Sequence, residues 1–565
     1  MVLLFLQLAL ILLCSVFAFI VMMRKHRKYW SNRGIPSPTP QLISGNFGSL
    51  YGDYPSMFQL RDWTRQYGKQ YGIQYGWRNA LVISDPAMVH ELLVTKFEYF
   101  HARNLSPIFG NLDTNKWISM FLARGGRWKR LRTIANPAFS VANLKKCMWL
   151  IDDSVKNAIN FLEKARNKGE SFNIHRHFVE MSFDMIARVA LGQRESRQFE
   201  TEMAHLAIES MQKYNNTPFD YVGFSFPWFG IHFLEPFISW SGILRKDPLI
   251  ILRKQLMDEL KARKKLRESG EQQQQQQQRA KVDFIDLFLE TEQNEQQQLT
   301  EQCQNEGEAM LSKTALQVGR ERKGEGRVAK RCTLEEIAMQ LLLFLLAGFD
   351  TSANTLSLVC HALALHAEVQ EKVQEEIDSV CFDEDPTYEQ LSQLKYTEAV
   401  VKETLRLLPI ATNVMNRTCC QTTTLGDITV EKGTVVMCDI LSLHHDKTVW
   451  GEDADEFRPE RHKKINKIVQ DNGPNGIEMA NLWLEAGHQL PPFYAFGGGP
   501  RICIGMRFAM IEEKLALVRI LRKYSIAQTA DTEKELAFSG QSVITPKSVT
   551  VGLKLRDEER HGTFE

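Results

Sequence analysis

The ten residues FGGGPRICIG, 496–505, decide how this chain is read, because they set a single cysteine at a glycine-rich bend. The bend runs into IGMRFAMIEEKLALVRILRKY, 504–524, whose apolar residues recur at helical spacing. Cys503 is therefore expected just before the start of a helix. A helix N-terminus stabilises negative charge through its free N–H groups, and the thiolate is the form of cysteine that ligates and reacts.

Three interpretations of Cys503 follow from the residues around it. The bend holds four glycines, Gly497, Gly498, Gly499 and Gly505. Glycines allow the backbone to approach something flat and bulky, and Arg501 would pair with an acidic group on that object. A buried structural cysteine after a glycine turn is the second interpretation. A nucleophilic thiol is the third, and it requires a histidine base that the sequence alone does not locate.

A second stretch, LLLFLLAGFDTSANTL at 341–356, interrupts a long apolar helix with polar residues. Gly348 costs about 1 kcal/mol relative to alanine in a helix, and a buried Asp350 costs more unless it is partnered. We expect a groove beside these residues. A hydroxyl on Thr351 next to the carboxylate of Asp350 is suited to relaying protons. The alternative is a kinked helix with a purely structural role.

Two short motifs are weak when taken singly. In KETLRLLP, 402–409, Glu403 and Arg406 lie three apart on one helical face and can pair, but a surface pair contributes little. In RWKRLR, 127–132, Trp128 and Arg132 fall four apart and offer two donors suited to a carboxylate. A solvated basic helix explains the second motif equally well.

The composition sets limits on function. The 565 residues are 44% hydrophobic and 24% charged, which is ordinary for a globular protein with a large core. A net charge of +1 gives no reason to expect nucleic acid as a partner. The ten cysteines lack the spacing of a zinc site, and no disulfide framework is indicated.

The N-terminus predicts a membrane anchor. Residues 1–23 carry no charged side chain and are long enough to span a bilayer, and RKHRK follows at 24–28. The positive charge after the apolar stretch places the rest of the chain on the cytosolic side, whereas a cleaved signal peptide is normally basic before it. A signal peptide remains the alternative. Pro36, Pro38 and Pro40 then predict a stiff, extended segment.

The remainder divides by composition. We expect an anchor at 1–23, a basic and proline-rich hinge at 24–48, and one globular body at 49–565. Polar insertions are predicted at about 268–280, 291–331 and 465–490, where the apolar content is too low to favour order. The aromatic stretch 219–240 is either buried core or a surface that contacts lipid or a substrate entrance.

Taken together and in this order, the motifs resemble those of the cytochrome P-450 superfamily, from the anchor to about residue 555. FGGGPRICIG fits the haem-binding signature Phe-x-x-Gly-x-Arg-x-Cys-x-Gly at every fixed position. AGFDT, 347–351, is similar to the oxygen-activating helix of that family. Glu403 and Arg406 resemble its invariant pair, and Arg461 in FRPER, 457–461, resembles the arginine that locks the pair.

Finer similarity points to the microsomal clan that contains the vertebrate drug-metabolising family three. KETLRLLPIA, VQEKVQEEIDSV and CIGMRFAMIEEKLALVRIL carry it. In that family, arginines equivalent to Arg103 and Arg417 contact haem propionates. The chain departs from the pattern in two ways: the step from Arg406 to Arg417 is one residue longer, and the polar insertions are extra.

The resemblance implies a mainly α fold with a small β region, preceded by a single transmembrane helix. It implies haem b, iron protoporphyrin IX, with the Cys503 thiolate as axial ligand of the iron. Asp350 would supply protons and Thr351 would hydrogen-bond oxygen, while Glu403, Arg406 and Arg461 would be structural locks. The residues that would bind the cofactor are Arg103, Trp128, Arg132, Arg417, Phe496, Gly499, Arg501 and Gly505.

The resemblance also implies a monooxygenase that inserts one atom of O2 into a lipophilic small molecule. Its electrons would come from NADPH through a separate cytochrome P-450 reductase, with Lys129 and Arg130 as contacts and cytochrome b5 as an additional candidate partner. The chain would lie in the endoplasmic reticulum membrane, facing the cytosol and touching lipid. The sequence does not identify the substrate.

Two alternatives remain. One is a haem-thiolate isomerase or dehydratase that acts on peroxides without O2, and the pair Asp350 and Thr351 argues against it. The other is a non-catalytic haem-binding membrane protein, and the intact set of motifs argues against that.

Overall fold

The computed structural model describes residues 2–50, 52, 54–213, 218–244, 246–269, 283–291, 332–462 and 492–556. The polar insertions expected at 268–280, 291–331 and 465–490 lie outside these residues, apart from residues 268, 269 and 291.

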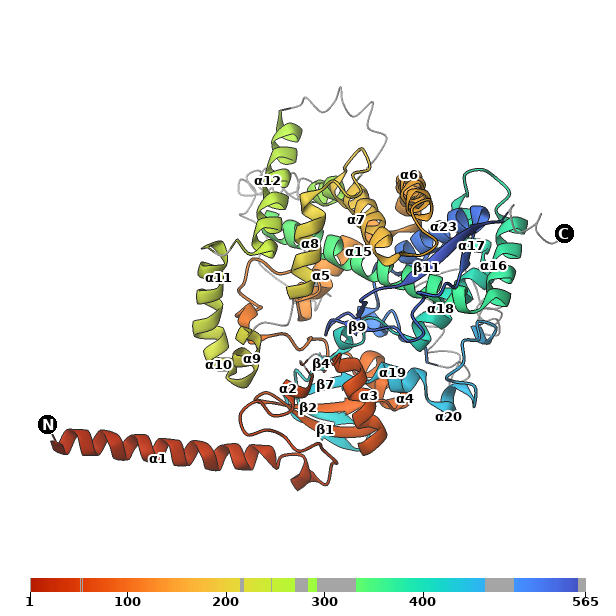
Figure 1. The fold of residues 1–565 in the computed structure, drawn as a ribbon. Coiled ribbons are helices and arrows are strands. Elements are labelled where there is room, and N and C mark those ends of the chain that lie inside the picture. Colours follow the sequence, from red (N-terminus) through yellow and green to blue (C-terminus); the bar gives the residue numbers. More distant parts are fainter. Residues whose placement is uncertain are drawn as a thin grey trace, which may run out of the picture.

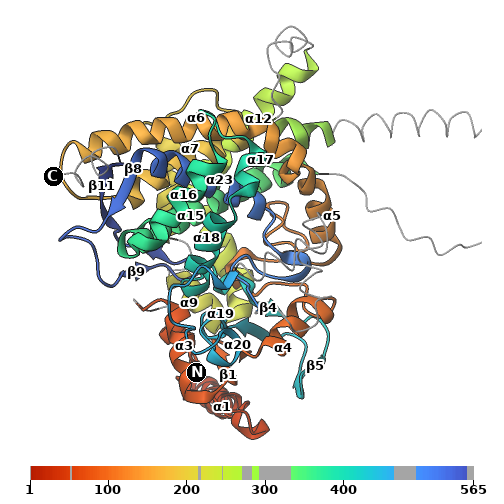
Figure 2. The ribbon, with the colours of Figure 1, turned by 90° about the vertical axis from the view of Figure 1, so that its right-hand side faces the viewer.

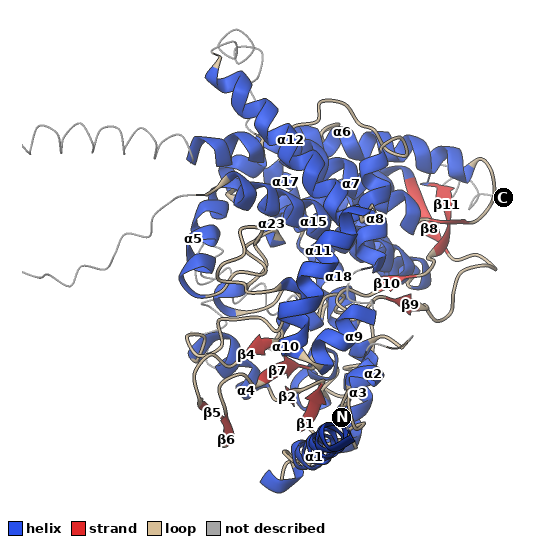
Figure 3. Ribbon diagram, turned by 90° about the vertical axis from the view of Figure 1, so that its left-hand side faces the viewer, coloured by secondary structure: helices blue, strands red, loops and turns tan. Residues whose placement is uncertain are grey.

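Helices dominate the described chain (Figures 1 and 3). Those of the first half are α1 (Val2–Arg27), η1 (Ser31–Arg33), α2 (Phe47–Leu50), α3 (Ser56–Tyr67), α4 (Pro86–His90), η2 (Glu91–Thr95), η3 (Pro107–Phe109), α5 (Gly125–Ala135), η4 (Asn136–Phe139), α6 (Val141–Arg166), α7 (His175–Leu191), α8 (Glu202–Lys213), α9 (Pro218–Ser225), α10 (Pro227–Phe229), η5 (Gly230–Leu234), α11 (Glu235–Leu244) and α12 (Pro248–Glu268). Those of the second half are α15 (Leu334–Leu365), α16 (Ala367–Val380), α17 (Tyr388–Gln393), α18 (Lys395–Leu407), η6 (Asn413–Met415), α19 (Ile440–His444), α20 (Lys447–Trp450), η7 (Gly499–Arg501) and α23 (Met506–Lys523).

The strands are short and form four small sheets. They are β1 (Gln70–Tyr75), β2 (Arg78–Ile83), β3 (Phe172–Asn173), β4 (Arg417–Thr418), β5 (Thr423–Leu425), β6 (Ile428–Val430), β7 (Val435–Cys438), β8 (Tyr524–Ala527), β9 (Phe538–Ser539), β10 (Thr545–Pro546) and β11 (Thr550–Leu555). The expected fold class, mainly α with a small β region, is therefore confirmed.

The long helix α15 forms the centre of the helical part (Figure 1). Its start is fixed by a capping box, in which Thr333 and Glu336 satisfy each other's backbone N–H groups. Most of its apolar side chains are buried, as expected for a helix that other helices surround. Helix α7 lies against it so closely that a Cβ atom on Gly348 would come within 3.0 Å of Ile186.

The main sheet has the strand order β1-β2-β7-β4 and lies at the opposite end from α12 (Figures 1 and 2). Strand β2 is parallel to β7 with Ala80 opposite Val435, and β4 pairs antiparallel to β7 with Arg417 opposite Val436. This register carries Arg417 from the sheet toward the interior, where it is 1% exposed. The sheet thus positions Arg417, which was expected to bind the cofactor.

Helix α1 projects from the body at the end that holds this sheet (Figure 1). It is apolar and mostly exposed, and of the described helices only α1 and α15 are long and apolar enough to cross a membrane. Because α15 is mostly buried, α1 is the candidate membrane anchor. The His26 ring stacks on Trp77 with centroids 4.9 Å apart, which joins the end of α1 to the body.

The segment expected to be a hinge packs on the sheet. Trp30 is 2% exposed and its indole N–H donates to the carbonyl of Ile73 at 2.9 Å. Gly72 leaves the room for that ring, since a Cβ atom there would lie 2.1 Å from it. The proline-rich stretch continues this contact, because the Gly72 N–H donates to the Pro36 carbonyl at 2.9 Å.

Candidate active site around Cys503

Two backbone hydrogen bonds shape the loop that carries Cys503. The N–H of Gly497 donates to the carbonyl of Tyr494 at 2.8 Å, and the N–H of Cys503 donates to the carbonyl of Phe496 at 2.9 Å. Helix α23 begins at Met506 with Gly505 at the N-cap position, so Cys503 lies three residues before the helix. The loop holds the cysteine at the helix N-terminus, as the sequence predicts.

Two of the four glycines in the loop, Gly498 and Gly499, make room for neighbouring parts of the protein, which corrects the expectation for these two. A Cβ atom on Gly499 would lie 1.9 Å from the carbonyl oxygen of Leu93 in η2, and its φ of +64° disfavours any other residue. A Cβ atom on Gly498 would lie 2.9 Å from the Tyr494 ring. Gly505 differs, since a Cβ atom there would make only an ordinary contact, 3.9 Å, with Cys503 Sγ. Gly499 therefore shapes the loop against η2.

Cys503 is exposed, although the helix that follows it is buried. The surrounding protein nevertheless raises the pKa of the Cys503 thiol through desolvation. The N–H of Gly505 and the charges of Arg132 and Arg103 act in the opposite direction. Desolvation outweighs the expected effect of the helix N-terminus, and only a strong positive centre at Sγ would favour the thiolate.

Four arginines gather around this space, and their charges affect one another. Burial is the main reason that the pKa of each lies below its ordinary range, to about 9 for Arg501 and about 10 for Arg417. The neighbouring charges of Arg417 and Arg132 lower the pKa of Arg501 further. The group comprises Arg103, Arg132, Arg417 and Arg501.

The arginine side chains are held by backbone carbonyls from separate elements. Arg132 Nη1 donates to the carbonyl of Ile502 at 3.0 Å, which ties α5 to the cysteine loop. Arg501 Nη2 donates to the carbonyl of Ala123 at 2.6 Å, and its guanidinium lies 4.7 Å from the centre of the Trp128 ring. Trp128 is thus a buried platform for Arg501.

Arg103 and Arg417 complete the group from the sheet side. Arg103 donates from Nε to the carbonyl of Val414 and from Nη1 to that of Phe121, both at 3.0 Å. Arg417 Nη1 donates to the carbonyls of Met415 and Asn416 at 3.0 Å. The extra residue between Arg406 and Arg417 therefore does not remove Arg417 from the group.

The polar groups of this space fit a haem group with two carboxylates. Among the described residues, no Asp or Glu forms an ion pair with any of the four arginines. The buried Nε atoms of Arg417 and Arg501 have no hydrogen-bond partner in the described part of the chain. Buried charges require compensation, and the propionates of a haem would provide it. The accessible thiol of Cys503 is a suitable fifth ligand for its iron.

Asp350 and Thr351 of helix α15 differ in their exposure. Thr351 is half-buried, and its hydroxyl donates to the carbonyl of Ala347 at 2.7 Å, which leaves its lone pairs free to accept. Ala347 itself is exposed in the middle of a buried helix, so this face of α15 borders open space. Asp350 is buried, and burial raises its pKa to about 7 against the opposing hydrogen bond of Asn354.

A groove was expected beside Gly348, Asp350 and Thr351, but Gly348 itself faces helix α7. A Cβ atom on Gly348 would lie 3.0 Å from Ile186. The glycine is needed for the close approach of two helices, and the open face is the one that carries Ala347 and Thr351.

The expected lock is a buried ion-pair network around Glu403. Arg406 donates to both carboxylate oxygens, from Nε at 2.8 Å and from Nη2 at 2.9 Å, and Arg461 Nε donates to Oε1 at 2.8 Å. Glu403 and Arg406 are both 0% exposed. Burial by itself raises the pKa of Glu403, but the hydrogen bonds of His462 and Arg406 lower it to about 2.

Sequence reasoning missed two histidines in this region. His462, next to Arg461, places Nε2 2.9 Å from Glu403 Oε2 and joins the network. His444 places Nδ1 3.1 Å from the carbonyl of Arg406, and its Nε2 accepts the N–H of Tyr494 at 2.9 Å. His444 therefore connects the lock to the loop of Cys503. The sequence offered only adjacency to Arg461 as a signal for His462, and none for His444.

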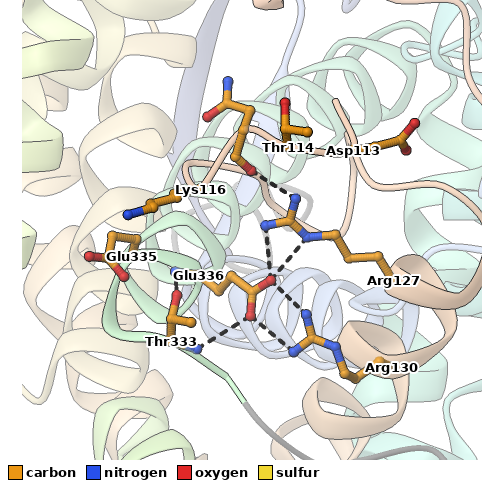
Figure 4. A pocket seen from close by; sticks show the side chains of 9 residues that line it. Asp113, Thr114, Lys116, Arg127, Arg130, Thr333, Glu335 and Glu336 are labelled. Carbon is orange, nitrogen blue, oxygen red and sulfur yellow. Dashed lines mark hydrogen bonds and ion pairs between the residues drawn. The ribbon is translucent and has the colours of Figure 1, made fainter. Parts of the chain in front are cut away.

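Arg130, which was expected to contact a reductase, forms an ion pair within the protein. Arg130 Nη2 lies 2.6 Å from Glu336 Oε1, and Arg127 Nε lies 3.0 Å from the same oxygen. Figure 4 shows both guanidinium groups converging on Glu336, at a pocket of about 440 Å³ none of whose lining residues belongs to the Cys503 loop. The neighbouring Lys129 is exposed. Arg130 therefore ties α5 to α15, and Lys129 stays available.

Comparison with known proteins agrees with this geometry. The family model for cytochrome P450 matches residues 35–553. The putative cytochrome P450 CYP13A7 of Caenorhabditis elegans is 37% identical over 530 residues, which cover 94% of this chain and 95% of that protein. Two further proteins of the same organism, the putative cytochromes P450 CYP13A8 and cyp-13B1, are each 34% identical over 94% of this chain and over 97% and 95% of their own lengths.

Proposed function

Because the chain belongs to the cytochrome P450 family, whose members are haem-thiolate monooxygenases, we propose that it oxidises a lipophilic small molecule with O2. Electrons would come from NADPH through a separate reductase, and the product would carry one oxygen atom as a hydroxyl or epoxide. The observation that carries the proposal is the accessible thiol of Cys503 beside four arginines, two of them buried, that have no carboxylate partner among the described residues.

The cofactor is haem b, and each of its anchors has a matching group. Cys503 would ligate the iron, supported by the N–H of Gly505. Arg501, Arg132, Arg103 and Arg417 would pair with the propionates, with Trp128 beneath Arg501. When bound, the haem supplies activation of O2, which a thiolate ligand favours. Phe496 contributes the carbonyl that holds the Cys503 N–H, and Gly499 fixes the loop against η2.

Asp350 and Thr351 would hold and move protons in the proposed reaction. With a pKa near 7, the Asp350 carboxyl can both hold and release a proton at neutral pH. The Thr351 hydroxyl donates to Ala347, so its oxygen is free to accept a hydrogen bond from a water or a reacting group. Glu403, Arg406 and Arg461 would act as a structural lock and not in the reaction.

A lipophilic substrate is favoured by the apolar surface around α9–α11. Trp228 is 67% exposed and Trp240 is 63% exposed. Other large apolar side chains are exposed in the same elements, namely Tyr221, Phe226, Phe229, Phe233 and Phe237. Figure 1 places these elements on the side from which α1 projects. We propose that both contact the endoplasmic reticulum membrane, so that substrate is taken up from the lipid.

The first test is the difference spectrum of the reduced, carbon-monoxide-bound protein, for the wild type and for Cys503→His. A strongly red-shifted thiolate band that the variant loses supports the ligand assignment. A wild type that binds haem without that band would overturn it.

The second test separates the activities. Purified protein with NADPH, reductase and 18O2 should give a product that contains one labelled atom. Conversion of a peroxide without NADPH would favour the isomerase alternative. Absence of NADPH consumption with every lipophilic compound tried, in protein that retains the thiolate band, would favour the non-catalytic alternative.

A further inference from the structure

A cavity of about 460 Å³ lies beside the start of helix α7. Its wall is formed mainly by α7, by α8 and by the chain around β9 and β10. None of the residues that line it belongs to the group around Cys503 or to the lock around Glu403. Pockets that bind small molecules measure about 300–1,000 Å³. The cavity therefore has the size of a ligand site of its own, and it shares no residue with the haem site.

Basic side chains from three distant parts of the chain line this cavity. They are Arg176 of α7, His205 of α8 and Lys547, which follows β10. All three are exposed, and none of them forms an ion pair with a carboxylate in the described part of the chain. Clefts lined by one sign of charge attract ligands of the opposite sign. The charged donors of Arg176 and Lys547 are thus available to an anion.

The net charge of the wall is small. Glu180 is the one acid among the described lining residues, and it is 6% exposed, with Oε2 accepting a backbone N–H at 2.8 Å. Burial lowers the pKa of His175, which also lines the cavity, so its ring is neutral at neutral pH. With His205 also neutral, Arg176 and Lys547 against this carboxylate leave one positive charge. The wall therefore suits an anion with a single charge better than a phosphate with two.

An aromatic residue in an uncommon backbone conformation forms part of the wall. Phe199 has a φ of +65°, in the left-handed region, which is rare for a bulky side chain. Its hydrogen bond to Glu180 holds it there, as do the rings of Phe161 and His177, whose centroids lie 4.9 and 5.5 Å away. Backbone conformations of this kind cluster at functional sites. The guanidinium of Arg176 lies 5.6 Å from the centre of the Phe199 ring, so a charge adjoins an apolar surface.

We propose that this cavity binds a monocarboxylate with an apolar body, of the fatty-acid class. The planar guanidinium of Arg176 can form two parallel hydrogen bonds with a carboxylate, and Lys547 adds a second positive charge to the wall. The apolar residues of the wall cover the body of the ligand, namely Val179, Phe199, Ile208 and Pro546. This acid is a second ligand and not the molecule that is oxidised, so the proposal goes beyond the proposed function.

Equilibrium dialysis of the haem-containing protein with dodecanoate tests the proposal, with the detergent alone as the blank. Binding close to the haem iron shifts the Soret absorption band, whereas binding in this cavity leaves the band unchanged. The dialysis should therefore count one equivalent of dodecanoate that a Soret titration does not. In the double variant Arg176→Ala/Lys547→Ala, the Kd of that equivalent should rise about tenfold, because charge-assisted hydrogen bonds are lost. The Soret titration and the carbon-monoxide spectrum should not change.

Further measurements separate charge from shape. Lys534→Ala removes an exposed lysine that does not line the cavity, and this matched control should keep the wild-type Kd. Ile208→Trp adds bulk to the wall without changing its charge and should weaken binding. Hexanoate should bind more weakly than dodecanoate, because it buries fewer methylene groups.

Three outcomes would overturn the proposal. A double variant that binds dodecanoate as tightly as Lys534→Ala does would show that the cations of this cavity do not hold the acid. A Soret titration that accounts for all of the bound dodecanoate would place the acid at the haem site only. Displacement of dodecanoate by inorganic phosphate, with no dependence on chain length, would show that the cavity binds a small anion instead.

Discussion

His444 accepts the backbone N–H of Tyr494 at 2.9 Å, and this bond ties the loop of Cys503 to the lock formed by Glu403 and Arg406. The other ring nitrogen lies 3.1 Å from the carbonyl of Arg406. One partner is a donor and the other an acceptor, so the ring is neutral with its proton on Nδ1. The ring is fully buried and stacks on Phe493.

Replacing His444 should release the cysteine loop. In His444→Phe the N–H of Tyr494 and the carbonyl of Arg406 lose their partners, at about 1–3 kcal/mol each. Urea unfolding should therefore show a loss of about 2–6 kcal/mol in the free energy of unfolding, and the thiolate band should weaken. His445→Phe is the control, because that ring is partly exposed and water can replace its contacts. Equal stability of the two variants would contradict the link.

The charge of Glu403 should be required for folding. Glu403→Gln leaves the buried guanidinium of Arg406 with an incomplete partner, and breaking a buried ion pair costs about 3–5 kcal/mol. The matched control is Glu431→Gln, which breaks the exposed pair with Arg33 and should cost less than about 1 kcal/mol. Urea unfolding and haem content would be measured for both. A Glu403→Gln protein as stable as the control would refute the lock.

The free energy of unfolding should decrease in mild acid because His177 and His444 have lowered pKa values in the folded protein. Burial, followed by the charge of Arg176, lowers the pKa of His177 from 6.5 to about 4, and burial lowers that of His444 well below 6.5. Below pH 6.5 the unfolded chain binds protons that the folded chain excludes, so the free energy of unfolding decreases as pH falls, by about 1.4 kcal/mol per pH unit for each histidine.

The variant His177→Phe isolates one of these contributions. Its ring can keep the edge contacts with Phe172 and Phe199. Urea unfolding at several pH values between 7.5 and 4 should show a shallower decline than in the wild type. An identical slope would show that His177 is not protonated on unfolding in this range.

Variants of Lys129 and Arg130 should have different effects, the first on reductase binding and the second on stability. Lys129→Gln removes an exposed charge from α5 and should raise the KM for the reductase about twofold to fivefold at low ionic strength, with little change in stability. Arg130→Gln removes a partner of the buried Glu336 and should lower the free energy of unfolding instead. Steady-state NADPH oxidation against reductase concentration, at low and high salt, checks the first. A raised KM for the reductase in Arg130→Gln, with stability unchanged, would instead support Arg130 as a docking residue.

Much of the site could be predicted from short motifs, because those motifs act locally. The bend at 496–505 places Cys503 before a helix through its own backbone hydrogen bonds. Glu403 and Arg406 face each other because they lie three apart on one helix. Arg103 and Arg417 were named only through family resemblance, since they come from distant parts of the chain and nothing local joins them.

Other features depend on contacts that the sequence does not encode locally. The ion pair of Arg130 was not predicted because its partner, Glu336, lies 206 residues away. Gly499 was misinterpreted because the carbonyl that excludes a side chain there belongs to Leu93. His444 carried no signal, because a histidine in a helix has no visible role until the backbone opposite it is in place.

The sequence by itself determined the mainly helical class, the apolar N-terminal helix and the presentation of Cys503, because periodicity, charge and turn chemistry act over a few residues. Only the tertiary structure decided which charges are left without partners and which pairs are buried. Those properties depend on desolvation, and desolvation is set by the elements that pack around a side chain and not by its neighbours in the chain.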